Sequence, residues 1–559
     1  MKSVLVPVLL CAAFQSVFAA TADQWRGRSI YQIITDRFAL PSGTDPNACQ
    51  PSEQTWCGGT WNTIRENLDY VQNAGFTAIW ISPVNQNYHG PRSAYGDAYH
   101  GYWMADVSQL NDRFGTADDL KALSAEVHRR NMYLMVDVVV NNVMATSTTP
   151  DYSSYFFKDA SLYHHYCPIE WGNTTSEQNC WLGDTKVPLP DVNTQNPTVI
   201  SQYGTWIADL VKEYSIDGLR IDAAKYVFNE GLWHVNIDFW PGFCASAGVF
   251  CIGEVFGGSD IDPIAMYQGP QALDSVLNFP LYTALLSAFT IPGPQNISAL
   301  TQVFEDSKTK FKDVGLLGNF LENQDLPRWH NLSVDPQSMY NAMTFAFMSD
   351  GIPIVYYGQE QYFSGNTDPF NREPLWPSNY AKTDAYNLIA TLNKVSLPSF
   401  VTAFANVYQF RNFLVNTTNW ATQEAQILTT SPYGLAIMKG PVISIVTNIG
   451  SPPQNGTHIA VSSPYSSSTA MVNILTCAQW AVGAKGMLDA QYTLGGVPNI
   501  LVPLEMLNGS GMCENELGII AGNGGKAVAL NSSSNIISPT CFVTFLVIST
   551  LGLIFTVIS

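Results

Sequence analysis

Short runs of β-branched and aromatic residues recur along the first 360 positions and alternate with stretches of helical character. The runs read SIYQIITDRF, AIWISPV, YLMVDVVVNN, DGLRID, FCIGEVF, VLNFPLY, LLGNFLENQD and GIPIVYYGQE. Apolar runs of this length are typical of strands buried on both faces, and their alternation with helices is that of βα units. Eight of them favour a closed (β/α)8 barrel, an α/β fold, over an open sheet.

Two regions depart from this alternation. Residues 142–200 carry two cysteines, several aromatic residues, Gly and Pro with little helical periodicity, which indicates a subdomain inserted into the barrel. The barrel then comprises residues 20–141 and 201–420. Beyond residue 420, runs such as YGLAIMKG and VISIVTNIG are spaced by Gly, Asn, Ser and Pro, which predicts an antiparallel β-sandwich over residues 421–520.

The N-terminus, MKSVLVPVLLCAAFQSVFAA, has a basic residue, an apolar run and a small-residue site. This pattern predicts a secretory signal peptide over residues 1–19, cleaved after Ala19, and the alternative is a membrane anchor.

The C-terminus ends in an uncharged apolar tail, residues 541–559, preceded by a stretch rich in Gly and Ser, residues 521–540. Small residues, a polar spacer and a terminal apolar tail form the pattern of a glycosylphosphatidylinositol (GPI) anchor, whose attachment removes the tail. A single tail-anchoring helix is the alternative. We therefore expect a secreted protein with a flexible stalk, GPI-anchored at the outer face of the plasma membrane, at the cell wall, or at both.

Composition narrows the possible partners. The chain is 46% hydrophobic and 13% charged, as expected of a folded protein with a core rather than a disordered one. Its net charge of -19 and the absence of a dense Lys/Arg run argue against nucleic acid as a partner, and against a membrane surface other than through the anchor. Asn-x-Ser/Thr motifs at seven positions fit a glycosylated surface protein: Asn173, Asn296, Asn331, Asn416, Asn455, Asn508 and Asn531.

Eight cysteines lie outside the two terminal segments, in what would be an oxidising compartment. Short-range pairing is plausible between Cys49 and Cys57, between Cys167 and Cys180, and between Cys477 and Cys513. Cys244 and Cys251 are paired or free, because the sequence by itself does not fix connectivity.

Acidic residues end three of the predicted strands. GLRID ends with Arg220 and Asp222, IGE ends with Glu254, and ENQD ends with Asp325. Strand ends meet at one mouth of a barrel, and Arg220 and Asp222, two residues apart, share a face, so the guanidinium can keep that carboxyl ionised. Each acid alone could cap a helix or bind an arginine. Together they favour a glycosidase: an ionised Asp222 with Glu254 nearby would form a pair of carboxyls, which in retaining glycosidases lie roughly 5 Å apart.

The stretches DVVVNN, GLRIDAAKY, IGEVF and FLENQD resemble the four signature motifs of the α-amylase family of glycoside hydrolases. The likeness is nearest to secreted fungal α-amylases and their glycolipid-anchored relatives, and it runs from about Gln24 to about Leu517. It implies an eight-fold barrel with an inserted domain B and a C-terminal β-sandwich. It also implies that Asp222 is the nucleophile, Glu254 the general acid and base, and Asp325 the acid that grips the distorted sugar, with Arg220 as partner of the nucleophile.

The resemblance extends to sugar-binding residues. In YGDAYHGYW, Tyr102 would stack on the sugar at the cleavage point, and ordinary barrel-mouth packing is the alternative. In GNTDPFNREPLW, Asp368 and Arg372 would hold the next sugar, and the alternative is a surface salt bridge. The remaining implied residues near the substrate are Tyr95, His100, Trp103 and Lys225.

A structural calcium ion between barrel and inserted domain is implied as well. Its ligands would be the Asn141 amide, the Asp191 carboxylate, and two carbonyls near Gln178 and Tyr226. Several oxygen ligands suit Ca²⁺, and a satisfied polar pair without metal is the alternative.

The sequence departs from the family at two histidines, which are replaced by Asn142 and Gln324. By resemblance those histidines bind hydroxyls of the sugar being cleaved, and neither replacement can become cationic. Loss of one aimed transition-state donor costs about 3 kcal/mol, so two weaker donors would slow hydrolysis on the order of 10² to 10⁴ fold.

We therefore expect poor hydrolysis and 4-α-glucanotransferase activity on an α-1,4-glucan or maltooligosaccharide donor and acceptor, in cell-wall α-glucan metabolism. Anchored relatives are associated with cell-wall α-glucan. An ordinary endo-acting α-amylase and a catalytically dead glucan-binding protein are the alternatives. A monomer is the family's usual form.

Overall fold

The computed structural model describes residues 20–47, 49–170, 173–225, 237–393, 410–452, 457–492, 495–507, 510, 512–513 and 517. The predicted signal peptide, stalk and apolar tail lie outside these ranges. Every predicted run overlaps a strand of one parallel sheet: β1 (Ile30–Ile33), β2 (Ala78–Ile81), β5 (Tyr133–Val139), β8 (Gly218–Lys225), β9 (Phe250–Val255), β10 (Ser275–Val276), β11 (Gly318–Asn319) and β12 (Ile352–Tyr356). The run VLNFPLY shares only Val276 with β10, and its second half begins a helix at Phe279.

The sheet closes into a barrel. Hydrogen-bonded neighbours follow the order β10-β9-β8-β5-β2-β1-β12-β11, and the paired strands are parallel. A parallel bridge between Leu277, directly after β10, and Gly318 of β11 joins the two ends of this order. The predicted (β/α)8 barrel is confirmed.

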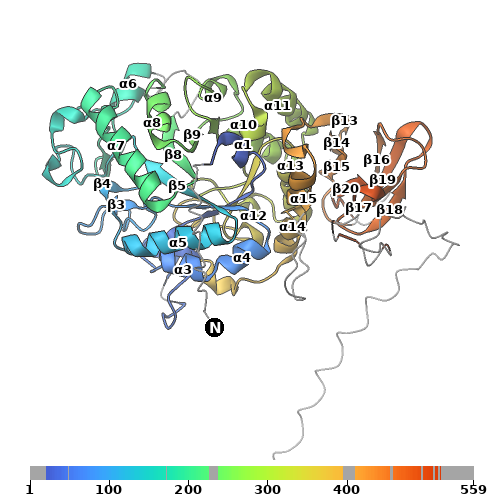
Figure 1. Cartoon of the computed structure of the whole chain (residues 1–559), viewed down its shortest axis with the longest axis horizontal. Helices are drawn as coiled ribbons and strands as arrows, with labels where there is room; N and C mark the ends of the chain where they lie inside the picture. Colours follow the sequence, from blue (N-terminus) through green and yellow to red (C-terminus); the bar gives the residue numbers. More distant parts are fainter. Residues whose placement is uncertain are drawn as a thin grey trace, which may run out of the picture.

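Helices surround the strands (Figure 1). In the described chain they are α1 (Ala22–Trp25), α2 (Thr35–Phe38), α3 (Trp61–Glu66), α4 (Leu68–Asn73), α5 (Ala117–Arg129), α6 (Thr174–Asn179), α7 (Pro197–Tyr214), α8 (Phe239–Ala247), α9 (Asp262–Ala265), α10 (Phe279–Phe289), α11 (Ile297–Lys310), α12 (Trp329–Leu332), α13 (Pro336–Met348), α14 (Asp384–Asn393) and α15 (Phe410–Thr417). Helix α5 shows how the sequence determines a helix. Thr116 and Asp119 form a capping box at its start, and Leu120, Leu123 and Val127 form its buried face.

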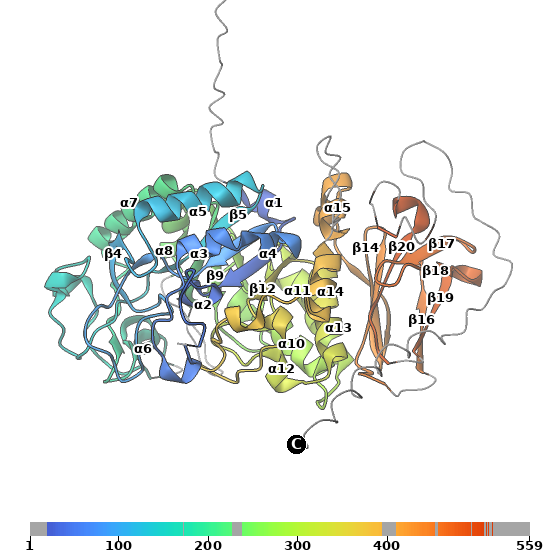
Figure 2. The same ribbon diagram turned by 90° about the horizontal axis from the view of Figure 1, so that it is seen from below.

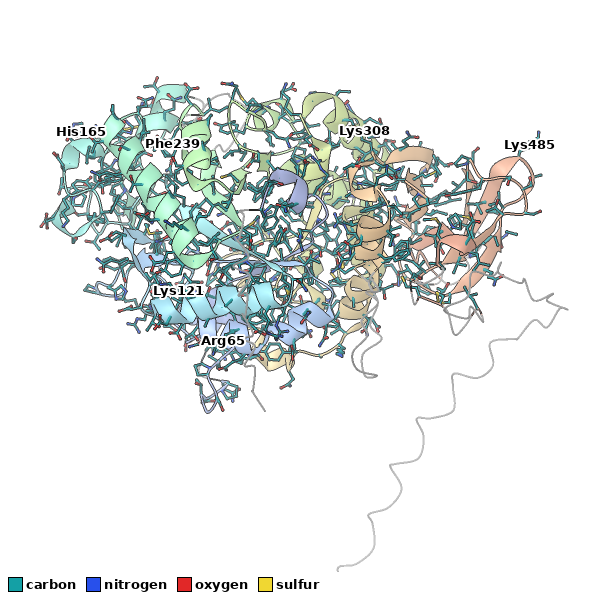
Figure 3. All side chains as sticks on the ribbon, viewed as in Figure 1. Arg65, Lys121, His165, Phe239, Lys308 and Lys485 are labelled. Carbon is teal, nitrogen blue, oxygen red and sulfur yellow. A yellow bond between two sulfur atoms is a disulfide. The ribbon has the colours of Figure 1, made fainter. Side chains whose placement is uncertain are left out.

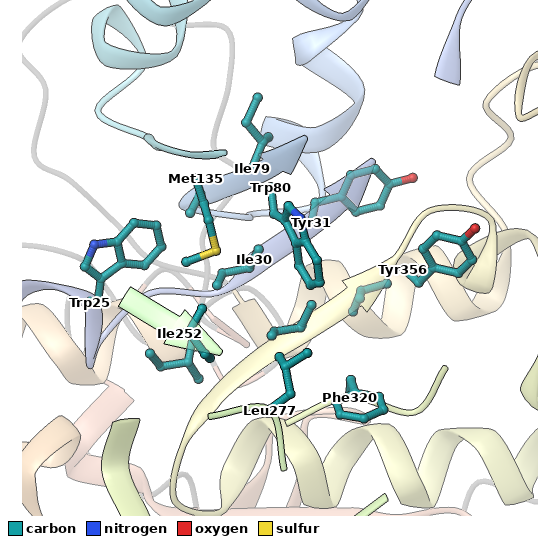
Figure 4. Close-up of a cluster of buried hydrophobic side chains, with 14 of the residues drawn as sticks. Trp25, Ile30, Tyr31, Ile79, Trp80, Met135, Ile252, Leu277, Phe320 and Tyr356 are labelled. Carbon is teal, nitrogen blue, oxygen red and sulfur yellow. The ribbon is translucent and has the colours of Figure 1, made fainter. Parts of the chain in front are cut away.

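Branched apolar side chains fill the barrel below its mouth. Figure 4 shows Ile30, Met135 and Ile252, from three different strands, and Leu277, directly after β10, pointing toward one another. Gly318 has no space for a side chain there, because an added Cβ would lie 2.8 Å from Ile252 and 3.0 Å from Leu277. The interior is thus packed, and the polar groups are left to the carboxyl ends of the strands.

Loops on the carboxyl side of the barrel carry extra structure. Strands β3 (Asn85–Asn87) and β4 (Met104–Leu110) pair antiparallel after β2. Within the predicted insertion lie α6 and the antiparallel pair β6 (Leu182–Gly183) and β7 (Pro188–Leu189), and the barrel helix α7 begins at Pro197.

The C-terminal region is antiparallel throughout its described part. One sheet has the order β13-β14-β15-β20-β17-β18, and β16 pairs with β19 in a second layer. The bounds are β13 (Gln426–Ser431), β14 (Gly434–Lys439), β15 (Val442–Thr447), β16 (Thr457–Ser462), β17 (Ala470–Asn473), β18 (Ala478–Ala481), β19 (Met487–Tyr492) and β20 (Asn499–Pro503). Ile443 and Leu501 of the first sheet share a buried cluster with Val461 and Leu488 of the second, which confirms the sandwich.

The barrel lies between its two additions. The insertion is at one end of the molecule and the sandwich at the other in both Figure 1 and Figure 2. Figure 3 marks these extremes with His165 in the insertion and Lys485 in the sandwich. Helices α13, α14 and α15 face the sandwich.

The proposed cysteine pairs are confirmed as disulfides between Cys49 and Cys57, Cys167 and Cys180, and Cys477 and Cys513. Cys244 and Cys251 have free thiols. Among the residues that the structure describes, no helix is long and apolar enough to span a bilayer.

Candidate active site at the carboxyl ends of the barrel strands

Adjacent strands bring the predicted catalytic residues together. Asp137 of β5 stands in register with Arg220 of β8, and Asp222 follows two residues later on the same face. Glu254 lies near the end of β9, where its Oε2 accepts a hydrogen bond of 3.1 Å from the backbone N–H of Ala223. The pairing of β5, β8 and β9 therefore fixes three carboxyl groups around one guanidinium.

Arg220 is fully buried and contacts all three acids. Its Nη1 donates to Asp222 Oδ1 at 2.7 Å and to Asp137 Oδ1 at 2.9 Å. Its Nη2 lies 2.9 Å from Glu254 Oε2. The sequence predicted Arg220 as a partner of Asp222; in the fold its single positive charge is shared by three carboxyls.

This division affects both predicted catalytic groups. Burial raises the pKa of Asp222 to about 6, with a further rise from Asp137 and Asp325, against the lowering effect of Arg220. Burial and the charge of Asp222 also raise the pKa of Glu254, while Arg220 lowers it. At pH 7 the Asp222 carboxyl is mainly ionised. The site can thus combine an ionised carboxylate with a neighbouring carboxyl that holds its proton more tightly than an exposed Glu.

Asp325 belongs to a second ion-pair group at the mouth. Arg372 Nη2 donates to Asp325 Oδ1 at 3.2 Å, and Arg372 Nη1 lies 3.2 Å from Asp368 Oδ1. The side chain of Asp325 is 43% exposed, that of Asp368 is 48% exposed, and that of Arg372 is 7% exposed. A buried cation therefore holds two acids whose side chains are partly exposed at the mouth.

Asp137 is a further acid of the site that was not predicted from the sequence. Besides bonding Arg220, this buried carboxylate accepts hydrogen bonds from Trp80 Nε1 at 3.1 Å and from the Tyr102 hydroxyl at 2.8 Å. It thereby links Tyr102 to Arg220. A signal was present in the sequence, because an acid in the middle of VDVV is exceptional in a strand that is otherwise buried and apolar.

The other aromatic candidates lie in the same loop. The buried His100 accepts a hydrogen bond of 3.0 Å from the Tyr102 N–H at Nδ1, and its ring packs edge-on against Trp103 at 4.8 Å. Burial lowers the pKa of His100 well below its usual value, so the ring is neutral. Tyr95 is exposed, and its hydroxyl donates to Asp184 of the insertion at 2.6 Å.

The two residues that depart from the family motif are both buried. Gln324 Oε1 accepts a hydrogen bond of 2.6 Å from Gln32 Nε2 of β1. Asn142 forms an antiparallel bridge with Asp191 of the insertion. Lys225 is the last residue of β8, and the described part of the chain does not include its side chain.

The proposed calcium ligands are brought together in part. The backbone carbonyl of Asn141 accepts from the Val192 N–H at 2.9 Å, which sets Asn141 beside Asp191. Asp191 is buried, and its Oδ2 lies 2.6 Å from His164 Nδ1. A buried carboxylate next to an asparagine fits a hard cation. Gln178 is in α6, and Tyr226 lies outside the described residues. A cluster of three or more His, Cys, Asp or Glu side chains suited to a metal is not found in the described chain.

Comparison with known proteins agrees with this geometry. Residues 32–398 match the family described as "Alpha amylase, catalytic domain", and residues 427–518 match "Alpha-amylase, domain C". The chain is 47% identical to Alpha-amylase 1 of Lipomyces kononenkoae over 385 residues, which are 68% of this chain and 60% of that relative. It is 39% identical to Alpha-amylase 2 of Schwanniomyces occidentalis over 505 residues, 89% of this chain and 94% of that relative.

A solved α-amylase structure from Malbranchea cinnamomea superposes with a TM-score of 0.81 at 37% identity, covering 89% of this chain and all of that one. The catalytic-domain match alone spans more than half of the 559 residues. The chain belongs to the α-amylase family of glycoside hydrolases.

Proposed function

We propose that this protein is a retaining α-amylase-type enzyme that cleaves α-1,4-glucosidic bonds and transfers the glycan to another sugar. The observation that carries the proposal is the contact of one buried guanidinium, Arg220, with both Asp222 and Glu254. Carboxyls that share the terminal nitrogens of one arginine are close neighbours, which favours the separation of about 5 Å in retaining glycosidases over the wider gap of inverting ones.

In the proposed reaction, a carboxylate oxygen of Asp222 bonds to the anomeric carbon while the bond from that carbon to the leaving oxygen breaks. Glu254 gives its proton to the leaving oxygen. In the second step an incoming hydroxyl returns a proton to Glu254 and bonds to the anomeric carbon, and Asp222 leaves. Asp325 binds hydroxyls of the distorted ring. Two inversions restore the starting configuration.

The remaining candidates would bind the sugars on either side of the broken bond. Tyr102 would stack on the reacting sugar, and Asp137 holds its hydroxyl in place. Asp368 and Arg372 would hold the next sugar through the ion-pair group at the mouth. Further contacts are proposed for Tyr95, His100, Trp103, Asn142, Lys225 and Gln324.

Transfer rather than efficient hydrolysis is proposed because of Gln324 and Asn142. Gln324 is a neutral amide whose oxygen is already bonded to Gln32, so it offers the sugar a single, uncharged donor group. Weaker stabilisation of the transition state slows the attack of water, and a sugar acceptor can compensate with binding energy beyond the cleavage point.

An ordinary α-amylase is the second candidate, favoured by the printed names of the relatives from Lipomyces and Schwanniomyces. A catalytically dead glucan-binding protein is disfavoured, because Asp222, Glu254 and Arg220 are present and in contact.

Product analysis separates these functions. Purified protein is incubated with maltopentaose, and the products are sized by mass spectrometry. Oligosaccharides longer than the substrate are expected, and products that are only shorter would exclude the transferase.

The Glu254→Gln variant, with unchanged circular dichroism, should lose activity by about 10³-fold or more. Products released by the enzyme should keep the α configuration, and inversion would overturn the mechanism.

We further propose one Ca²⁺ held by the Asn141 amide, the Asp191 carboxylate and carbonyls at Gln178 and Tyr226. Its charge would neutralise the buried Asp191 and tie the insertion to the barrel. The C-terminal tail and stalk would place the enzyme on the cell surface through a GPI anchor, as a secreted monomer acting on cell-wall α-glucan.

A further inference from the structure

Gln32 of β1 and Gln324, in the loop after β11, meet inside the barrel although β12 lies between β1 and β11 in the sheet order. Gln32 Nε2 donates to Gln324 Oε1 at 2.6 Å, and the two residues are 2% and 1% exposed. The geometry points to Gln32 as a positioning residue that orients the Gln324 amide as a hydrogen-bond donor to the reacting sugar. The inference deepens the proposed function and rests on it.

The backbone of Gln324 is fixed independently of this contact. Its carbonyl accepts from Asn371 Nδ2 at 2.9 Å and from Arg372 Nε at 3.2 Å, and Arg372 also holds the adjacent Asp325. What remains free is the orientation of the side-chain amide, which has one acceptor end and one donor end. Gln32 engages the acceptor end, so the NH₂ group is left for another partner.

The pair makes a poor stabilising element. Gln32 Oε1 is buried and has no hydrogen-bond partner among the described residues. A buried acceptor without a partner costs stability that one neutral hydrogen bond barely offsets, so an apolar side chain of the same length should fit equally well. A purely structural role and a positioning role thus predict opposite results for the same substitution.

Gln32→Met removes the hydrogen bond and keeps the length of the side chain. The expected result is a melting temperature equal to or above that of the unmodified protein, with kcat lower by about tenfold and KM raised by no more than severalfold. Gln32→Glu should lower kcat further, because a carboxylate accepts only and turns the Gln324 oxygen toward the sugar. Gln268→Met is the matched control: this buried glutamine bonds Asp313 outside the site, so its loss should lower stability and leave kcat unchanged.

The donor role is tested with α-maltosyl fluoride and its 2-, 3- and 6-deoxy derivatives in the reacting ring. The Gln32→Met effect should disappear with the one derivative that lacks the hydroxyl bound by Gln324, and in the Gln324→Met background. An effect that persists with every derivative, or a kcat equal to that of the unmodified protein, would overturn the inference.

A second readout separates this outcome from failure of the proposed function. Binding of maltotetraose is measured in the Glu254→Gln background, where Gln32→Met should raise Kd severalfold. If the unmodified protein turns over no maltosyl fluoride, the proposed function is wrong. The Kd comparison still tests the role of Gln32 in that case. An unchanged Kd would then overturn the inference about Gln32. If turnover is normal and neither kcat nor Kd responds to Gln32→Met, the inference alone is wrong.

Discussion

Arg220 determines how the acids at the mouth ionise, because its charge is shared. Asp137 also binds the Arg220 guanidinium, and its own negative charge disfavours the ionised form of Asp222. Burial is the main reason why the pKa of Asp222, about 6, lies above that of an exposed aspartate, and the charge of Asp137 raises it further. The proposed catalytic pair, Asp222 and Glu254, is therefore coupled, and its pH profile should report the group of acids rather than one residue.

The pH dependence of kcat/KM follows from these shifts. Asp222 must be ionised to attack, so activity should fall as the pH drops through about 6. Asp137→Asn removes a negative neighbour and frees Arg220 for Asp222, which favours the ionised form. The acid limb should then move to lower pH, as measured by initial rates on maltopentaose in buffers of constant ionic strength. A limb that stays in place or moves upward would contradict the proposed coupling.

At the scale of elements, β9 approaches β8 closely near Asp222 and Glu254, the two acids proposed to be catalytic. A Cβ added to Gly253, the residue before Glu254, would lie 2.3 Å from Leu273 Cδ1 and 3.0 Å from Ala224 Cβ of β8. Glycine at this position lets the two strands pair and keeps Glu254 near Arg220.

Gly253→Val should therefore push β9 away from β8. We expect a loss of stability of about 1–3 kcal/mol and a fall in kcat beyond what partial unfolding explains, since Glu254 moves with the strand. Urea unfolding and kinetics at low temperature measure the two effects. Gly242→Ala in α8 is the control, because an added Cβ there has no neighbour within 4 Å, and stability should stay equal or rise slightly.

The inserted segment offers a test of the proposed metal. Chelation with EDTA should lower the melting temperature. Adding free Ca²⁺ at 100 times its Kd should raise the free energy of unfolding by about 2.7 kcal/mol. Asp191→Asn should abolish most of the difference between the two conditions. Equal melting temperatures with and without calcium would exclude the site.

For the whole molecule, buried hydrogen bonds join the barrel to the sandwich. Asn341 of α13 accepts from the Thr447 N–H at 2.8 Å and donates to the Gly496 carbonyl at 2.7 Å. Asp350, after the same helix, pairs with Lys439 of β14 at 2.7 Å. Both contacts fix the sandwich against α13, away from the catalytic mouth.

Asn341→Ala leaves two buried backbone groups without partners. The expected destabilisation is about 2–4 kcal/mol, with earlier proteolysis of the sandwich and little change in KM, because the mouth is not involved. Calorimetry and limited proteolysis provide the measurements. Asn387→Ala on α14, whose amide bonds only Lys382 among the described residues and is exposed, should shift stability by less than about 0.5 kcal/mol. An equal effect of both substitutions would refute the role of Asn341.

The sequence by itself predicted the eight strands, the antiparallel sandwich, the three disulfides and the placing of acids at strand ends. These features depend on local patterns: runs of branched apolar residues, turn residues between them, and cysteines close in sequence. The family motifs added Asp222, Glu254 and Asp325, which do lie at the carboxyl ends of β8 and β9 and after β11.

Only the tertiary structure decided which of these groups touch. Asp137 bonds Arg220 across 83 residues of sequence, and Gln32 bonds Gln324 across 292. Such contacts depend on strand register and on closure of the barrel, which bring side chains together that no local pattern relates. For the same reason the raised pKa of Asp222 was not predictable, since it results from burial and from acids on neighbouring strands.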